Sequence, residues 1–249
     1  MIEEDQFLDL SLIKLERNNM THLSIIIPVY NEGTVIRKVI NGLPNKIKGI
    51  DKITVLAVND GSTDNSAEEI KKTSAILISH PLNMGAGSAT VTGISAAKIL
   101  KADVAVTIDG DGQHHPSDIA KVIQPILQHK ADIVIGTRLK KSKGMPSIKK
   151  FGNWGLNIIT FALSRIWTSD SQSGFKAFSR NAISKLDIGS LGYEFCSEVL
   201  IEAKRQKLKL TEVPIRVIYT DYSKRKGQSI FNGTNIVIKL IIRKITRTI

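Results

Sequence analysis

The sequence predicts an α/β domain with a mostly parallel central sheet. Apolar runs typical of strands alternate with helix-like segments along residues 23–135, the order expected when parallel strands are connected through helices. The first run, Leu23–Pro28, is continuously apolar, as in strands buried on both faces of a sheet. The chain has 249 residues, of which 42% are hydrophobic, so it can bury one large core.

Each expected strand is an apolar run, and each expected helix follows a polar or glycine-containing loop that breaks the strand pattern. The expected elements, in order, are a strand at 23–28, a helix at 34–43, a strand at 52–58, a helix at 64–73, a strand at 75–79, a helix from the loop 83–87 to about residue 100, a strand at 102–108, a helix at 116–128 and a strand at 133–135.

The single cysteine, Cys196, excludes an internal disulfide framework and suits a reducing compartment. The first 20 residues are acidic and do not form an export signal. No run reaches the roughly 18 to 20 apolar residues that span a bilayer. We therefore expect a chain that does not cross a membrane by itself.

The net charge of +12 is unevenly placed. Six cations and no acid lie between Thr137 and Asn153, and twelve cations against three acids lie from Ile201 to the end. Such an excess attracts polyanions: nucleic acid, an anionic membrane surface or phosphorylated substrates. The alternative is a solvated surface that favours solubility.

The expected organisation is an N-terminal extension at 1–22, an α/β domain at 23–229 and a basic amphipathic helix at 230–249. Translation starts at either Met1 or Met20. In the last segment, Ile and Val side chains fall on one helical face and Lys and Arg on the other. This pattern suits a bilayer interface, although the apolar face could instead pack on the domain.

Asp109 and Asp111 follow an apolar strand, with Gln113 close behind. Two carboxylates at this spacing can hold a hard divalent cation, whereas the alternative is a turn in which the acids accept backbone hydrogen bonds. His114 and His115 adjoin this segment, and we favour structural or supporting roles for them over metal binding.

Further polar residues follow other strands. Asp60 could bind a ribose or a base edge, or serve a turn and helix cap. The loop 83–87 could present backbone amides to an anion at a helix N-terminus, or serve close packing. Asn31 and Glu32 follow the first strand. Because open α/β sheets bind ligands at the carboxyl ends of their strands, we expect one shared site.

Together these motifs resemble the family-two glycosyltransferases with a GT-A fold, and among them the dolichyl- or polyprenyl-phosphate sugar synthases, such as the dolichyl-phosphate mannose synthases. The motifs follow the family's order over residues 23–230. The matching stretches are Ile27–Glu32, Val58–Asp64, Gly85–Ala89, Asp109–Pro116, Gly136–Arg138, Asp170–Phe178 and Val213–Ile215.

The resemblance implies a role for each motif. The residues implied at the nucleotide sugar are Pro28, Tyr30, Glu32, Asp60, Gly85, Asp109, Gln113, Glu194, Glu198, Lys224, Arg225 and Lys226. Those implied at an Mg or Mn ion are Asp109, Asp111 and Gln113. Those implied in catalysis are Asp111, Arg138 and Asp170, and those at the acceptor are Arg138, Gln172 and Ser173. Two departures are Asn59, where the family has an acid, and 224–230, which lacks a final lysine.

The function expected from the resemblance is inverting sugar transfer to dolichyl or polyprenyl phosphate. The favoured donors are UDP-glucose and UDP-N-acetylglucosamine, with GDP-mannose as a further option. The enzyme would be peripheral at the cytoplasmic membrane face, with an oligomer or a membrane-protein partner left open. One alternative is transfer to a saccharide hydroxyl. Another is a non-catalytic nucleic-acid-binding module, which the absence of an aromatic platform among the cations disfavours; we expect no nucleic-acid partner.

Overall fold

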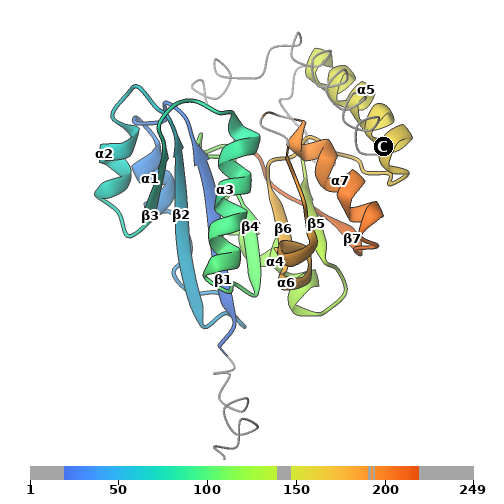
Figure 1. The fold of residues 1–249 in the computed structure, drawn as a ribbon, viewed down its shortest axis with the longest axis horizontal. Helices are drawn as coiled ribbons and strands as arrows, with labels where there is room; N and C mark the ends of the chain where they lie inside the picture. The colour runs from blue at the N-terminus through green and yellow to red at the C-terminus, as the bar shows by residue number, and fades with distance from the viewer. Residues whose placement is uncertain (1–19, 139–146, 190–191, 193, 219–249) are drawn as a thin grey trace, which may run out of the picture.

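A seven-stranded sheet forms the centre of the protein (Figure 1). The computed structural model describes residues 20–138, 147–189, 192 and 194–218. The strands are β1 (His22–Val29), β2 (Lys52–Asp60), β3 (Ile76–His80), β4 (Val104–Thr107), β5 (Ile133–Thr137), β6 (Lys176–Ser179) and β7 (Leu210–Pro214). Their order is β3-β2-β1-β4-β6-β5-β7. Only β6 runs against its neighbours, β4 and β5, so the prediction of a mostly parallel sheet is confirmed.

Helices cover both faces of the sheet (Figure 1). They are α1 (Ile36–Asn41), α2 (Ser66–Lys71), α3 (Ala86–Ile99), α4 (Asp118–Leu127), α5 (Ser147–Ser164), α6 (Arg180–Lys185) and α7 (Phe195–Arg205). Buried residues of α1, α2 and α4 form one hydrophobic layer, and those of α3, α6 and α7 form the other. No helix in the described part of the chain is long and apolar enough to cross a membrane.

The elements expected up to residue 137 are present, with shifted ends. Strand β2 extends to Asp60 because Asn59 and Asp60 pair with Ser79 and His80 of β3. Asp60 is therefore the last residue of a strand rather than the first of a loop. The expected strands 102–108 and 133–135 are not neighbours, since β6 lies between them.

Candidate active site

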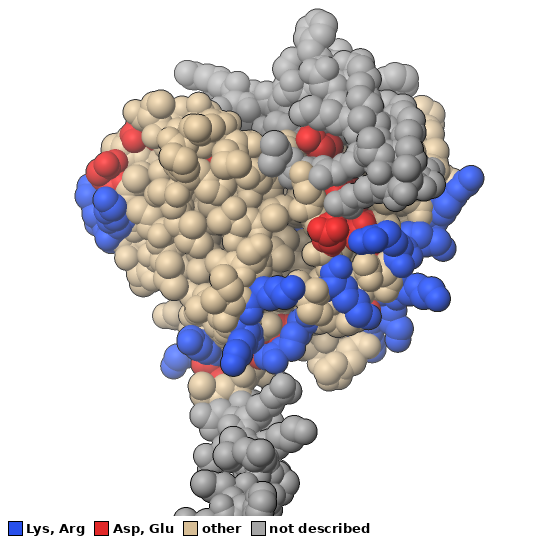
Figure 2. Space-filling model, in the orientation of Figure 1, with Lys and Arg blue, Asp and Glu red and all other residues tan. Residues whose placement is uncertain are grey.

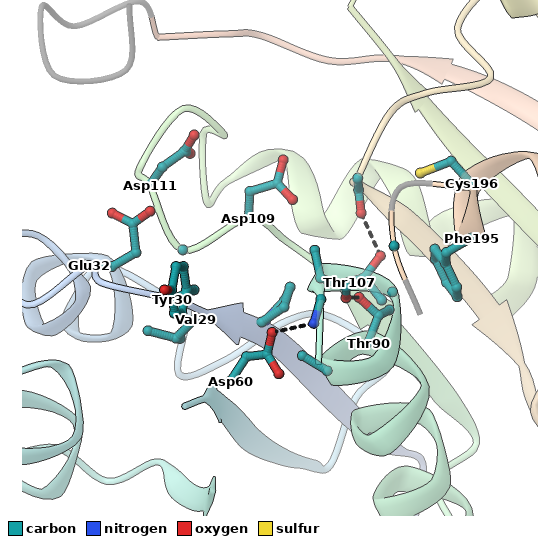
Figure 3. A pocket seen from close by; sticks show the side chains of 18 of the residues that line it. Val29, Tyr30, Glu32, Asp60, Thr90, Thr107, Asp109, Asp111, Phe195 and Cys196 are labelled. Atoms are coloured by element: carbon teal, nitrogen blue, oxygen red, sulfur yellow. Dashed lines mark hydrogen bonds between the residues drawn. The ribbon is translucent and has the colours of Figure 1, made fainter. Parts of the chain in front are cut away.

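A cavity of about 470 Å³ opens at the carboxyl edge of the sheet. Figure 3 shows Tyr30 and Glu32 at one end, Phe195 and Cys196 at the other, and Asp109 and Thr107 between them. Among the predicted site residues, the structure brings ten to its wall. They are Pro28, Tyr30, Glu32, Asp60, Gly85, Asp109, Asp111, Gln113, Arg138 and Gln172.

Other predicted site residues lie elsewhere. Asp170 and Ser173 are fully buried behind the wall. Glu194 and Glu198 are buried on α7 or beside it, and their carboxylates accept hydrogen bonds from the amides of Gly192 and Gly189. The predicted residues Lys224, Arg225 and Lys226, and the predicted helix 230–249, lie outside the described residues.

The loops after β1 and β2 are joined by hydrogen bonds from backbone to side chain. The amide of Asn31 donates to Ser62 Oγ (3.0 Å) and that of Glu32 to Ser66 Oγ (2.8 Å). The side chain of Asn59, where the resemblance implies an acid, accepts from the Ser62 amide at 3.1 Å. These bonds fix the two loops as one wall of the cavity.

Asp60 joins β2 to the loop that precedes α3. Its carboxylate accepts from the amides of Met84 (3.0 Å) and Gly85 (2.8 Å) and from His80 Nδ1 (2.7 Å). Gly85 has a φ of 100°, a conformation that glycine adopts without strain. The first turn of α3 then faces the cavity, and its unpaired amides favour an anion there.

Asp109 and Asp111 bring two carboxylates to the middle of the cavity wall. Asp109 Oδ2 accepts from His114 Nε2 at 2.8 Å. Burial alone would raise the pKa of Asp109, but the nearby charges of His114, Arg138 and Lys176 lower it below its usual value. Asp111 is held by the backbone amide of Gln113 (2.9 Å) and by its side-chain amide.

The pKa of Asp111 is raised, first by burial and then by the charge of Asp109. In the described part of the chain, no three His, Cys, Asp or Glu side chains gather as a ready-made metal cage. Two carboxylates that face a cavity can bind a hard cation, which takes its remaining ligands from phosphate and water. The residues present therefore fit a magnesium or manganese ion.

Gly174 allows Asp109 to lie where it does. A Cβ atom at this position would lie 2.3 Å from Asp109 Oδ1. The Gly174 carbonyl accepts from Thr107 Oγ1 at 2.6 Å, which fixes the segment before β6 against β4. Gly174, in the segment before β6, thus leaves room for the carboxylate of Asp109, in the segment after β4.

Arg138 brings a fixed positive charge to the cavity. Its Nε and Nη2 atoms donate to the two oxygens of Asp170 at 2.7 and 2.8 Å, and its amide donates at 3.0 Å. Burial opposes the charged form, but Asp170 more than compensates and raises the pKa of Arg138. Because Asp170 is fully buried, it acts on the cavity by orienting Arg138.

Sequence reasoning missed several residues at the end of the cavity where Arg138 lies. Thr107, Phe195 and Cys196 line the cavity, although no motif pointed to their side chains. Gly174, which lies within the motif Asp170–Phe178 of the resemblance, lines the cavity too, and Phe195 and Cys196 lie between Glu194 and Glu198, the two acids that the resemblance implies at the nucleotide sugar. Gln172 Nε2 donates to Ser171 Oγ (3.1 Å) and to Ser197 Oγ (3.0 Å), which fixes its amide in the wall.

The histidines beside the carboxylates have different positions. His114 is buried against Phe175, with ring centroids 5.1 Å apart, and orients Asp109. His115 is outside the cavity wall and contacts Ser117 and Arg216. The Ile218 amide donates to the Gln113 carbonyl at 2.8 Å, so the segment after β7 runs beside the loop that carries Asp109 and Asp111.

The described cations on the face in Figure 2 lie mainly along its lower rim and right-hand side, away from the carboxyl edge of the sheet. Of the six cations predicted between 137 and 153, the structure describes the side chain of Arg138 alone. Of these six cations, the structure therefore places the side chain of Arg138 at the cavity.

Comparisons with known proteins agree with this geometry. Residues 24–187 match the family model described as Glycosyl transferase family 2. The chain is 43% identical to the UDP-N-acetylglucosamine–dolichyl-phosphate N-acetylglucosaminyltransferase of Methanococcus voltae, over 90% of this chain and 97% of that protein. It is 28% identical to the dolichol-phosphate mannosyltransferase of Pyrococcus furiosus, over 88% of this chain and 63% of that one.

A solved structure shares the fold. It is the glucosyl-3-phosphoglycerate synthase of Mycobacterium tuberculosis in complex with Mn²⁺, UDP and glucosyl-3-phosphoglycerate. The TM-score is 0.69 at 19% identity, with 98% of this chain and 86% of that chain covered.

Proposed function

The chain belongs to glycosyl transferase family 2, and from that premise we propose that it transfers N-acetylglucosamine from UDP-N-acetylglucosamine to dolichyl or another polyprenyl phosphate. The observation that carries the proposal is the cavity in which Asp109 and Asp111 share one wall with Arg138. Acidic residues for a cation-bound diphosphate and a cation for an anionic acceptor are both present. The Methanococcus voltae relative supports the choice of donor and acceptor.

Tyr30, Glu32 and Asp60 bind the nucleoside in this proposal, and the first turn of α3 faces the phosphates. Asp109 and Asp111 hold a magnesium or manganese ion, and Gln113 orients Asp111. When bound, the ion neutralises charge that develops on the departing diphosphate.

The acceptor phosphate is an anion near neutral pH, so positioning and charge neutralisation matter more than a strong base. One of its oxygens forms a bond to the anomeric carbon from the face opposite the diphosphate. The bond from that carbon to the diphosphate breaks, and its electron pair leaves with UDP. The configuration at the carbon is inverted. Arg138, held by Asp170, holds the acceptor phosphate.

The donor phosphates are also contacted, in this proposal, by Lys224, Arg225 and Lys226. The Ile218 amide bonds to Gln113, and a chain of six residues spans at most about 20 Å. The segment is therefore within chain reach of the diphosphate.

A second part of the proposal is that α5 rests on the membrane surface. Trp154, Ile158 and Phe161 are exposed at the spacing of one helical face, and Trp167 contacts Phe161 edge to face with centroids 5.6 Å apart. Trp167 is 57% exposed. Aromatic side chains of this kind favour the boundary between lipid and water.

The inner side of α5 connects this surface to the site. Asn157 donates to the Ser169 carbonyl (2.8 Å) and accepts from the Ser171 amide (2.9 Å). Ser169 and Ser171 flank Asp170, the partner of Arg138. A bilayer against the outer face of α5 would thus lie near the end of the cavity where the lipid phosphate is expected.

The test is a transfer assay with the purified full chain, Mn²⁺, and either dolichyl or undecaprenyl phosphate. UDP-N-acetylglucosamine, UDP-glucose and GDP-mannose are compared, and released diphosphate and glycolipid mass are measured. We expect a glycolipid heavier than its acceptor by one N-acetylglucosamine residue. Transfer to a saccharide hydroxyl, with none to either lipid phosphate, would refute the acceptor assignment.

A further inference from the structure

The Asp60 carboxylate has little hydrogen-bonding capacity left for a ligand. A carboxylate offers about four acceptor positions, two on each oxygen. Oδ1 accepts from His80 Nδ1 at 2.7 Å and from the Met84 amide at 3.0 Å. Oδ2 accepts from the Gly85 amide at 2.8 Å. Counting these bonds between described residues, one position remains, on Oδ2.

His80 is the side chain that fills Oδ1. It is the last residue of β3, its side chain is 10% exposed, and its Nε2 lies 3.0 Å from Thr92 Oγ1 on α3. Because an ionised carboxylate only accepts, Nδ1 carries the proton of the bond to Asp60. The contacts at both ring nitrogens prevent His80 from turning away when a ligand arrives.

Nucleobases differ in how many donors they present to a carboxylate. The outer edge of guanine presents two adjacent donors, N1–H and N2–H, which together engage both oxygens of a carboxylate. Uracil presents a single donor, N3–H, between two carbonyl oxygens. One remaining position on Asp60 matches the uracil edge and leaves a guanine donor unpaired, which is costly when it is buried.

We propose that His80 is a specificity-determining residue, which selects uridine over guanosine diphosphates by filling Asp60 Oδ1. The proposal rests on the proposed function in one respect, that the base of a nucleotide sugar lies against Asp60. Asn83 lines the cavity and precedes Met84 in the sequence, and in this proposal its side-chain amide donates to a uracil carbonyl.

The test measures binding of UDP and GDP to the full chain with Mn²⁺ by titration calorimetry. We expect the wild type to bind UDP at least about tenfold more tightly than GDP. In His80→Ala, which frees a position on Oδ1, the ratio should fall by about tenfold. In His80→Asn, whose amide can still donate to Asp60, the ratio should stay near that of the wild type.

The matched control is His22→Ala. His22 is buried, and its Nε2 lies 2.9 Å from Thr54 Oγ1 at the far end of the sheet, so the change removes a similar contact without touching Asp60. Its UDP to GDP ratio should not change.

A purely structural role for His80 would weaken both nucleotides equally, so an unchanged ratio in His80→Ala would overturn the proposal. Equal affinity of the wild type for UDP and GDP would do the same. Because no acceptor is present, these outcomes are independent of whether the lipid phosphate assignment holds.

Discussion

Replacing Gly174 with alanine should disable the carboxylate site without unfolding the protein. The new Cβ would lie 2.3 Å from Asp109 Oδ1, whereas ordinary contact begins at 3.4 Å. The bond from Thr107 to the Gly174 carbonyl keeps the backbone in place, so the Asp109 side chain must move by about 1 Å and lose its geometry with His114. A displacement of this size at a reacting group costs about 100-fold in rate, or about 2.7 kcal/mol of transition-state stabilisation.

The assay is kcat/KM for UDP-N-acetylglucosamine across a Mn²⁺ titration, with thermal unfolding measured in parallel. The free energy of unfolding should fall by no more than about 3 kcal/mol, the cost of losing one hydrogen bond to a charged group, which leaves the protein folded. Gly155→Ala is the control, because a Cβ there meets nothing within 4 Å and alanine favours a helix. Wild-type kcat/KM in Gly174→Ala would refute the reasoning.

Three further changes test other parts of the site. Asp111→Asn should lower transfer by more than about 100-fold. Because the pKa of Asp111 is raised by burial and by Asp109, its ionised form costs stability at neutral pH; the variant should melt higher than the wild type at pH 7, and this gain should vanish as the pH falls below the unfolded value of 3.8. Arg138→Met should cost about 3 to 5 kcal/mol in denaturant unfolding, since it leaves a buried carboxylate unpaired; adding Asp170→Leu should restore stability but not activity, and a stable single variant would contradict the pairing. Trp154→Ser with Trp167→Ser should reduce co-sedimentation with vesicles that contain polyprenyl phosphate, while turnover of a detergent-solubilised acceptor stays unchanged; undiminished sedimentation would count against α5 as the docking surface.

The first half of the site could be predicted because its determinants are local. Asp60, Asp109 and Asp111 come at the ends of apolar strands, and a parallel sheet brings such ends to one edge. Their placement at one cavity follows from the pattern without knowledge of long-range contacts.

The second half depends on contacts that no local pattern encodes. Strand β6 is four residues long, and its position between β4 and β5 brings Gly174 against Asp109. The resemblance implies a role for Asp170 in catalysis, but its pairing with Arg138, 32 residues away, is a tertiary contact. Phe195 and Cys196 reach the cavity because α7 packs beside α5, where Thr160 and Ser197 lie in contact at 2.8 Å.

The position of β6 also has a consequence for folding. Strands β1 to β4 pair within the first part of the chain, but the outer edge of β4 finds its partner only in β6, where Thr107 contacts Lys176 at a separation of 69 residues. During synthesis that edge must wait for later residues, because in the folded sheet β5 pairs with β6 and β7 and not with β4. Contacts of such long sequence separation form slowly, and an unpaired strand edge promotes aggregation. We therefore expect insertion of β6 to limit the folding rate, and chains that end before it to aggregate.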